Sequence, residues 1–218
     1  MKLLLPYTNE ALKLIKKTRA WIGPILIFIL IMVAFPLTVE LSSTNLSDAF
    51  YPVLFISILL VMMLATEDIF LEDYEDGSLE LLLISNKSLS QWVFIKTFIH
   101  WLFIGVPISL LGTFFNIGAN NDLNSSLMLL PALGISTYIF LILFCFGNSL
   151  SLTKGSVLGT LITLPLTLPI LVILGKLTSA IIFNINYFEF LILLFGILSI
   201  IIFAFPAIIS RIIKTHLE

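Results

Sequence analysis

The residues of this sequence that could do chemistry are few, and most of them gather in one short stretch. The segment Glu67–Glu80 holds seven of the 13 acidic residues of the chain. Grouped carboxylates can serve in acid–base catalysis or hold a divalent cation. The spacing does not match an EF-hand loop, however, and no nucleophile accompanies the carboxylates. A solvated acidic turn and a docking element for another protein remain as interpretations.

The pattern around these acids favours a folded element over residues 67–86. Gly77 divides the stretch in two, because glycine adopts backbone angles that other residues resist. Asp76 can cap the second part, which is apolar at Leu79 and at residues 81–83. A capping box, Ser88-Leu-Ser-Gln91, then begins the next helix. The sequence therefore predicts a short helix that is apolar on one side and acidic on the other, a shape that suits docking to another protein.

Two further ionisable residues lie within an apolar segment. Lys96 and His100 are four residues apart and share one helix face. Lys96 is close enough to the end of its segment to extend its ammonium group to the interface. His100 is interpreted as a hydrogen-bonded packing histidine, with a haem ligand or a proton carrier as the alternatives.

Known catalytic patterns are absent from the sequence. It contains no G-x-x-x-x-G-K-[ST] phosphate loop, no H-E-x-x-H and no Ser/His/Asp set. One cysteine, Cys145, and two histidines allow neither a disulfide within the chain nor a His/Cys metal cluster. We therefore predict no catalytic residue and no metal site.

The amino-acid composition indicates whether the protein lies in water or in a lipid bilayer. Of the 218 residues, 59% are hydrophobic and only 11% are charged, and the mean hydropathy is +1.14. A soluble domain is roughly 45–50% apolar and about 25% charged. A globule of this size cannot bury so much apolar surface, which excludes a soluble enzyme and a nucleic-acid binder. The sequence predicts a single transmembrane domain over residues 1–218.

Six apolar segments are candidates to cross the bilayer, and backbone groups in hydrocarbon must be paired within each segment, which favours helices. They are Trp21–Val39, Phe50–Thr66, Trp92–Phe115, Ser126–Asn148, Val157–Leu174 and Tyr187–Ile209. Within the fifth, Gly155-x-x-x-Gly159 permits a close helix contact, and Pro165 and Pro169 predict a bend suited to a moving gate. We expect Lys176–Glu189 to be a short re-entrant or surface segment. The fold predicted is an all-α integral membrane protein.

Basic residues set the expected orientation. With the N-terminus inside, ten of the eleven Lys and Arg residues lie on the inner side and only Lys176 lies outside. Both termini are thus predicted to be cytoplasmic, or in the matrix. Residues 8–20 are expected to form an interfacial helix with lysines on one face and Leu12 and Ile15 on another.

Several of these motifs together resemble one family. The stretch Glu67–Glu80 is similar to the signature of the CcmB (haem exporter protein B) family of cytochrome c maturation system I, with seven matching residues: Phe70, Asp73, Asp76, Gly77, Ser78, Leu79 and Glu80. Lys96, His100 and Trp101 match a K-x-x-x-H-W pattern of that family, residues 164–169 resemble its fifth span, and Phe35-Pro-Leu37 resembles the end of its first.

The resemblance implies an ABC-2-type permease-like bundle of six helices in a bacterial or mitochondrial inner membrane. It implies a dimer of this chain with two copies of an ATP-binding subunit, a tryptophan-rich haem-handling membrane protein, a small helper subunit and a haem chaperone. ATP hydrolysis in the partner would drive haem handling and release of the haem-loaded chaperone. Coupling to the ATPase is expected at Phe70, Asp73, Asp76, Gly77, Leu79 and Glu80, and intramembrane roles at Lys96, His100, Pro165 and Pro169.

Two other functions fit the same architecture. A permease subunit of another ABC exporter, for polysaccharide or drug, would differ in its partners. A non-transporting membrane scaffold would need no ATPase. Haem and ATP are expected in the complex rather than as cofactors of this chain.

Overall fold

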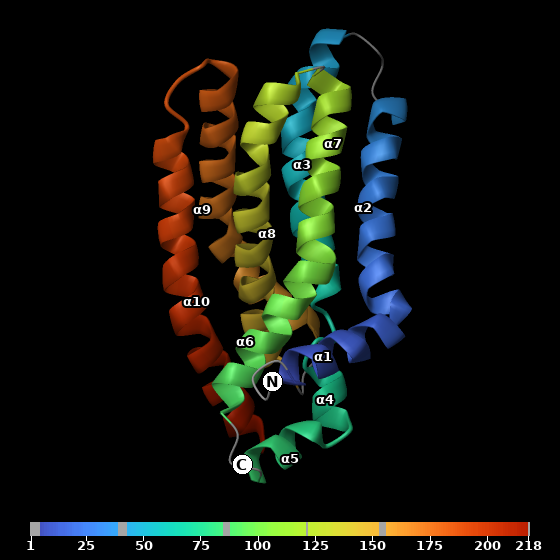
Figure 1. The fold of residues 1–218 in the computed structure, drawn as a ribbon, viewed down its shortest axis with the longest axis vertical. Coiled ribbons are helices and arrows are strands. Elements are labelled where there is room, and N and C mark those ends of the chain that lie inside the picture. The colour runs from blue at the N-terminus through green and yellow to red at the C-terminus, as the bar shows by residue number, and fades with distance from the viewer. Residues whose placement is uncertain (1–4, 39–42, 85–87, 121, 153–155, 218) are drawn as a thin grey trace.

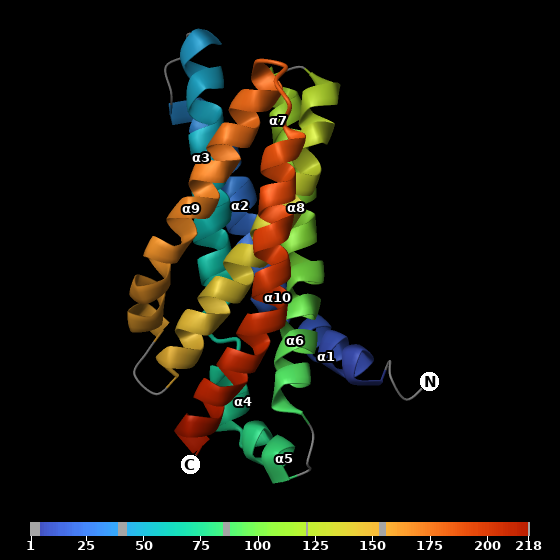
Figure 2. The same cartoon turned by 90° about the vertical axis from the view of Figure 1, so that its left-hand side faces the viewer.

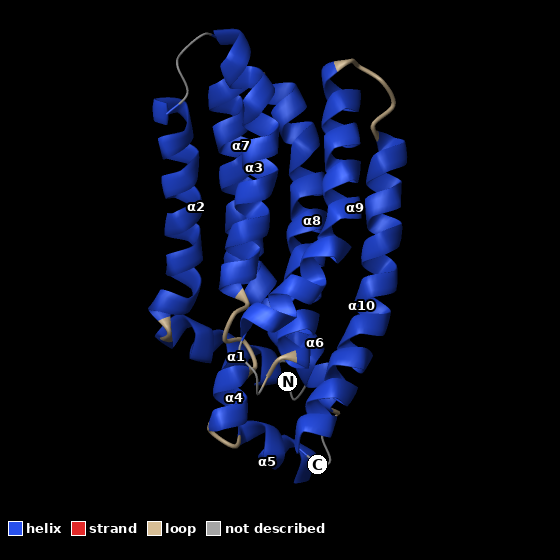
Figure 3. Cartoon of the chain, turned by 180° about the vertical axis from the view of Figure 1, so that it is seen from behind, coloured by secondary structure: helices blue, strands red, loops and turns tan. Residues whose placement is uncertain are grey.

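The computed structural model describes residues 5–38, 43–84, 88–120, 122–152 and 156–217. Helices joined by short turns make up these ranges, which contain no strand (Figure 3). The α-helices are α1 (Leu5–Lys16), α2 (Thr18–Thr38), α3 (Ser43–Ala65), α4 (Leu71–Glu75), α5 (Ser78–Ile84), α6 (Leu89–His100), α7 (Val106–Asn120), α8 (Leu123–Leu150), α9 (Ser156–Ile182) and α10 (Phe188–Leu217), and a π-helical turn, η1 (Trp101–Gly105), joins α6 to α7.

All six predicted spans coincide with helices. Five helical segments are long and apolar enough to cross a membrane: α2, the continuous α6–η1–α7 segment, α8, the apolar part of α9, and α10. The sixth, α3, has a shorter apolar part at residues 49–65. The predicted all-α membrane fold is therefore confirmed.

The long helices form a bundle with α8 at its centre (Figures 1 and 2). In α8, 67% of the apolar 18-residue stretch that could cross the membrane is buried, compared with 22% of the corresponding stretch in α2 and in α10. Helix α8 contacts α3, α7, α9 and α10. The peripheral helices expose large apolar side chains such as Leu30, Val172, Ile192 and Phe203. Such outward faces are stable against lipid and unstable against water.

The two termini, α1, α4 and α5 lie at one end of the bundle, called here the lower end as drawn in Figure 1. Helix α1 lies crosswise to the long helices, while α4 and α5 lie at the level of the lower ends of α6 and α10 (Figure 2). Helix α1 and the end of α10 therefore lie at the same end of the bundle, which agrees with the predicted placement of both termini on one side.

Several boundaries differ from the predicted ones, and two of the differences change the interpretation. The crosswise helix ends at Lys16 rather than at residue 20, because the Lys17 N–H closes the last turn on the carbonyls of Lys13 and Leu14 and α2 begins at Thr18. The predicted re-entrant segment at Lys176–Glu189 is wrong. Helix α9 continues to Ile182, because Leu177 and its neighbours Ala180 and Ile181 are buried against the bundle.

The turn after α9 is correspondingly short. Residues 183–187 join α9 to α10, and Asn184 there adopts a φ of 53°. Asparagine tolerates this left-handed conformation better than most residues. The polar residues that suggested a surface segment therefore form a tight connection between two spans.

Helices α8 and α9 approach each other closely at two glycines. A Cβ atom added at Gly159 would lie 2.0 Å from the carbonyl oxygen of Gly147, and one added at Gly147 would lie 2.4 Å from the carbonyl oxygen of Gly159. The close contact predicted for Gly159 is confirmed, with Gly147 of α8 as its counterpart. Gly155 lies outside the described residues.

Candidate functional site

The acidic segment after α3 folds into the two short helices α4 and α5, and its first helix is tied to the bundle by ion pairs. Asp73 of α4 pairs with Lys96 of α6 and lies 3.6 Å from the Lys13 ammonium of α1. The side chains of Asp73 and Lys96 are only 7% and 8% exposed. Asp73 thus connects the crosswise helix to a membrane-spanning helix.

Aromatic residues surround this buried ion pair. The Lys96 ammonium lies 4.9 Å from the centroid of the Trp92 ring, within cation–π distance. On the other side of Trp92, the ring of Phe70 lies at 6.0 Å between centroids. Phe70 is 1% exposed, so the turn before α4 is anchored in the core by an aromatic side chain.

A second ion pair joins the same two elements. Lys17, at the turn between α1 and α2, pairs with Glu72 of α4, and Lys13 is 3.9 Å from Glu10 within α1. Both lysines are about half exposed, so each surface contact contributes little by itself. Because Lys13 and Lys17 both contact α4, the two helices form one connected layer below the bundle.

The other half of the acidic segment faces outward. Asp76 and Glu80 are exposed, and so are two large apolar side chains of α5, Leu81 at 67% and Ile84 at 81%. Leu79 on the opposite face of α5 is fully buried. Helix α5 is therefore anchored by Leu79 and presents acidic and apolar groups to the outside, whereas the pattern predicted apolar residues on one side and acidic residues on the other.

The turn between α4 and α5 is built as the sequence indicates. Gly77 adopts a φ of 75°. The Ser78 hydroxyl and the Ser78 backbone N–H both donate to the Asp76 carboxylate, which holds the pKa of Asp76 below its usual range. Asp76 thus satisfies the first turn of α5, and Ser88 likewise accepts from the Gln91 N–H at the start of α6.

His100 and Trp101 lie where α6 gives way to the π-helical turn. The His100 Nδ1 lies 2.9 Å from the Lys96 carbonyl, and it donates there because a carbonyl only accepts. The Trp101 indole donates to the Gly134 carbonyl at 3.1 Å and to the Thr137 hydroxyl at 3.2 Å. Within the K-x-x-x-H-W pattern, the lysine on α6 therefore contacts α4, and the tryptophan at the start of η1 contacts α8.

The remaining predicted residues lie apart from this cluster. Pro165 and Pro169 are exposed on α9, which runs through both prolines as one helix. Within the part of the chain that the structure describes, no three His, Cys, Asp or Glu side chains gather as a metal site would require.

Three features of the site are beyond what the sequence pattern indicated. They are the ion pairs of Lys13 and Lys17 with α4, the π-helical turn, and the Gly147 contact. The i, i+4 spacing of Lys13 and Lys17 showed a shared face but gave no partner for it. Gly105 ends the π-turn where the Trp101 ring leaves no room for a side chain, and this packing could not be read from the sequence.

Comparison with known proteins gives a consistent family. The sequence model of the CcmB protein family matches residues 5–212. The chain is 29% identical over 167 residues to heme exporter protein B of Pseudomonas aeruginosa, covering 76% of this chain and 75% of that protein. It is 28% identical over 174 residues to heme exporter protein B of Haemophilus influenzae, with 79% of each covered. For heme exporter protein B of Paracoccus denitrificans, the identity is 31% over 147 residues, covering 66% and 67%.

Proposed function

The chain belongs to the CcmB protein family, and from this membership we propose that it is the membrane-spanning subunit of a haem-exporting ABC-type complex in c-type cytochrome biogenesis. The observation that supports the proposal most directly is the family match over residues 5–212, which includes the six spans and the α4–α5 element. Its place is an inner membrane, with the lower end on the cytoplasmic or matrix side. The chain itself is non-catalytic, and ATP is hydrolysed by a partner.

The α4–α5 element is the surface proposed to receive the ATP-binding subunit. It lies at the lower end of the bundle (Figure 1), and its side chains Leu81 and Ile84 are exposed. Apolar groups rimmed by the carboxylates of Asp76 and Glu80 have the composition of a protein-docking surface. Phe70, Asp73 and Leu79, which the family signature also contains, are buried and serve to hold this surface in place.

Movement of α4 has two routes into the membrane. The Asp73–Lys96 pair joins α4 to α6, and the Lys13 and Lys17 contacts join it to α1 and the start of α2. A partner whose nucleotide-bound and nucleotide-free forms contact α5 differently would therefore shift α4, and through its ion pairs would shift α6 and α1. Coupling requires such differential contact, since a partner that bound both states equally would change nothing.

The proposed complex contains further members. We place two copies of this chain with two ATP-binding subunits, a tryptophan-rich haem-handling membrane protein, a small helper subunit and a haem chaperone. Hydrolysis of ATP drives haem handling and release of the haem-loaded chaperone. Haem is the cargo of the complex, not a cofactor of this chain.

The test is co-purification through a tag on the C-terminal end. An ATPase and a tryptophan-rich haem protein are the expected partners in the eluate, whereas glycan or efflux proteins would favour another ABC exporter. Glu80→Lys reverses a charge on the rim of the docking surface and should reduce ATPase recovery by about tenfold, the scale of a lost charge contact. Glu189→Lys, at the opposite end of the bundle, is the matched control. Undiminished recovery with Glu80→Lys would contradict the assignment of the surface.

A further inference from the structure

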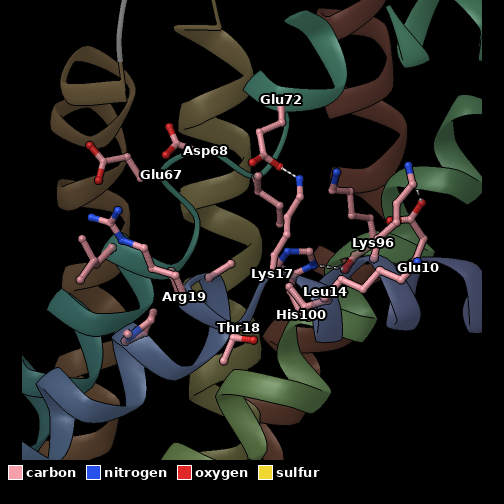
Figure 4. Close-up of a pocket in the computed structure, with 18 of the residues that line it drawn as sticks. Glu10, Leu14, Lys17, Thr18, Arg19, Glu67, Asp68, Glu72, Lys96 and His100 are labelled. Atoms are coloured by element: carbon pink, nitrogen blue, oxygen red, sulfur yellow. Dashed lines mark hydrogen bonds and ion pairs between the residues drawn. The ribbon is translucent and has the colours of Figure 1, made fainter. Parts of the chain in front are cut away.

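A cleft of about 880 Å³ opens at the lower end of the bundle, between the α1–α2 turn, the end of α3 and the turn before α4 (Figure 4). Its walls differ in character. One wall belongs to the start of the spans and is apolar, with Gly23, Pro24 and Ile27 from α2 and Leu64 and Ala65 from α3. Ile27 and Leu64 are each 39% exposed, so this wall is open at the level where lipid chains begin.

The opposite part of the cleft is lined by charges of both signs. Five cations and five carboxylates face it: Lys13, Lys16, Lys17, Arg19, Lys96, Glu10, Glu67, Asp68, Glu72 and Asp73. Six of these form the ion pairs described above. Lys16, Arg19 and Asp68 form no ion pair with any residue that the structure describes.

Those three groups come from two turns that border the cleft. Lys16 and Arg19 come from the α1–α2 turn, while Asp68 comes from the turn after α3. Figure 4 shows the Arg19 guanidinium turned toward the side of the cleft where Glu67 and Asp68 lie, yet no ion pair closes the gap. Among the described groups that line it, the cleft therefore has two cations without an ion pair, Lys16 and Arg19 (the cationic edge), and one such carboxylate, Asp68 (the acidic edge).

We propose that this cleft binds the headgroup of phosphatidylethanolamine. The phosphate lies against Arg19 and Lys16, since guanidinium and ammonium groups donate to phosphate oxygens. The primary ammonium donates to the Asp68 carboxylate, and the acyl chains run along Ile27 and Leu64 into the bilayer. This ligand has a positive group, a negative group and an apolar part, and the lining of the cleft offers a counterpart to each.

The acidic edge is what selects among phospholipids. Phosphatidylglycerol would bring its negative charge to the cationic edge but would leave Asp68 without a counter-ion. Phosphatidylcholine carries a positive charge without an N–H donor, so it would lose the hydrogen bond. The pKa of Asp68 is raised because the group is partly buried and lies near the carboxylates of Glu67 and Glu72. An ammonium group beside Asp68 offsets that repulsion.

Native mass spectrometry of the purified, delipidated chain tests the proposal without any partner subunit. The three phospholipids, with identical acyl chains, are titrated separately. We expect phosphatidylethanolamine to bind about tenfold more tightly than either of the others, the scale of one charge-assisted hydrogen bond. Equal or stronger binding of phosphatidylglycerol or phosphatidylcholine would overturn the proposal. Because no ATPase is present, the result is independent of the proposed coupling function.

Variants locate the binding to this cleft. Asp68→Asn should remove the preference for phosphatidylethanolamine over phosphatidylglycerol, and Lys16→Gln combined with Arg19→Gln should weaken binding of both. Arg211→Gln and Glu75→Gln change exposed charges at the same end of the molecule but outside the cleft, and they should leave binding unchanged. If Asp68→Asn keeps the full preference, or if the controls lose it equally, the lipid binds elsewhere and the assignment fails.

Discussion

Replacing Asp73 by asparagine tests the role of the buried ion pair most directly. The change keeps the size of the side chain but leaves the Lys96 ammonium charged and 8% exposed. Removing one partner of a buried pair costs about 3–5 kcal/mol, because the remaining charge stays desolvated. The lost contact with Lys13, which is 54% exposed, adds at most about 1 kcal/mol. The free energy of unfolding should therefore fall by about 3–5 kcal/mol.

The reverse single change has a smaller predicted effect. In Lys96→Met, Asp73 keeps the Lys13 ammonium at 3.6 Å, so its charge retains a partner that reaches solvent. The double variant Asp73→Asn/Lys96→Met removes both buried charges, and its loss should be smaller than the sum of the single losses by about 1 kcal/mol or more. The loss of unfolding free energy is thus larger in the variant that leaves a buried charge without a partner, which is Asp73→Asn.

The assay is thermal unfolding of the purified chain in lipid nanodiscs. For a chain of this length, a loss of 3–5 kcal/mol lowers the midpoint by roughly 6–20 °C. Glu75→Gln, an exposed carboxylate of the same short helix, is the control and should change the free energy by less than about 0.5 kcal/mol. A midpoint for Asp73→Asn equal to that of the control, or strict additivity in the double variant, would refute the reasoning.

Three further predictions follow from the structure. Gly159→Ala should cost about 1–3 kcal/mol of stability, because its Cβ atom would lie 2.0 Å from a carbonyl oxygen of α8, whereas Gly175→Ala, with nothing within 4 Å, should be tolerated in the same melting assay. Ser88→Ala removes the cap of α6 and should cost about 0.5–2 kcal/mol, with faster hydrogen exchange in the first turn of α6 alone. The carboxyls of Asp68 and Asp76 should affect pH stability in opposite directions. The folded-state pKa of Asp68 is raised, so its contribution to stability increases as pH falls through that pKa toward the ordinary value, and Asp68→Asn should lack this increase in melting experiments across a falling pH series. The pKa of Asp76 is lowered, so its contribution is present above the ordinary value and is lost as pH falls through the lowered pKa, a loss that Asp76→Asn should not show.

The α4–α5 element shows how far sequence patterns predict a site. Gly77, Asp76 and Ser88 have local roles, a left-handed turn and two caps, and each has the role that its residue type indicates. Local roles depend on neighbours within a few positions, which the sequence displays. Asp73 has the same charge as its acidic neighbours, and nothing in its spacing distinguishes it. Its burial between Lys96 and Lys13 depends on two helices that are distant in the sequence.

The error at Lys176–Glu189 has a related cause. Polar residues suggested the end of a span, but α9 extends past Lys176 because one of its faces is buried against the bundle. Whether a helix continues past a polar residue depends on which face that residue occupies and what lies opposite. A hydropathy profile gives neither the helix face that a residue occupies nor the element that packs against that face.

The sequence by itself determined the solvent, the number of spans, the segment that carries most of the acids and the family signature within it. These follow from composition and from short-range pattern, since apolar length and hydrogen bonding within a helix are properties of contiguous residues. The tertiary structure alone decided which charges are buried, which glycines meet and where the cleft opens. Those depend on the packing of segments separated by tens of residues, as in the pairing of Lys17 with Glu72 and the contact of Gly147 with Gly159.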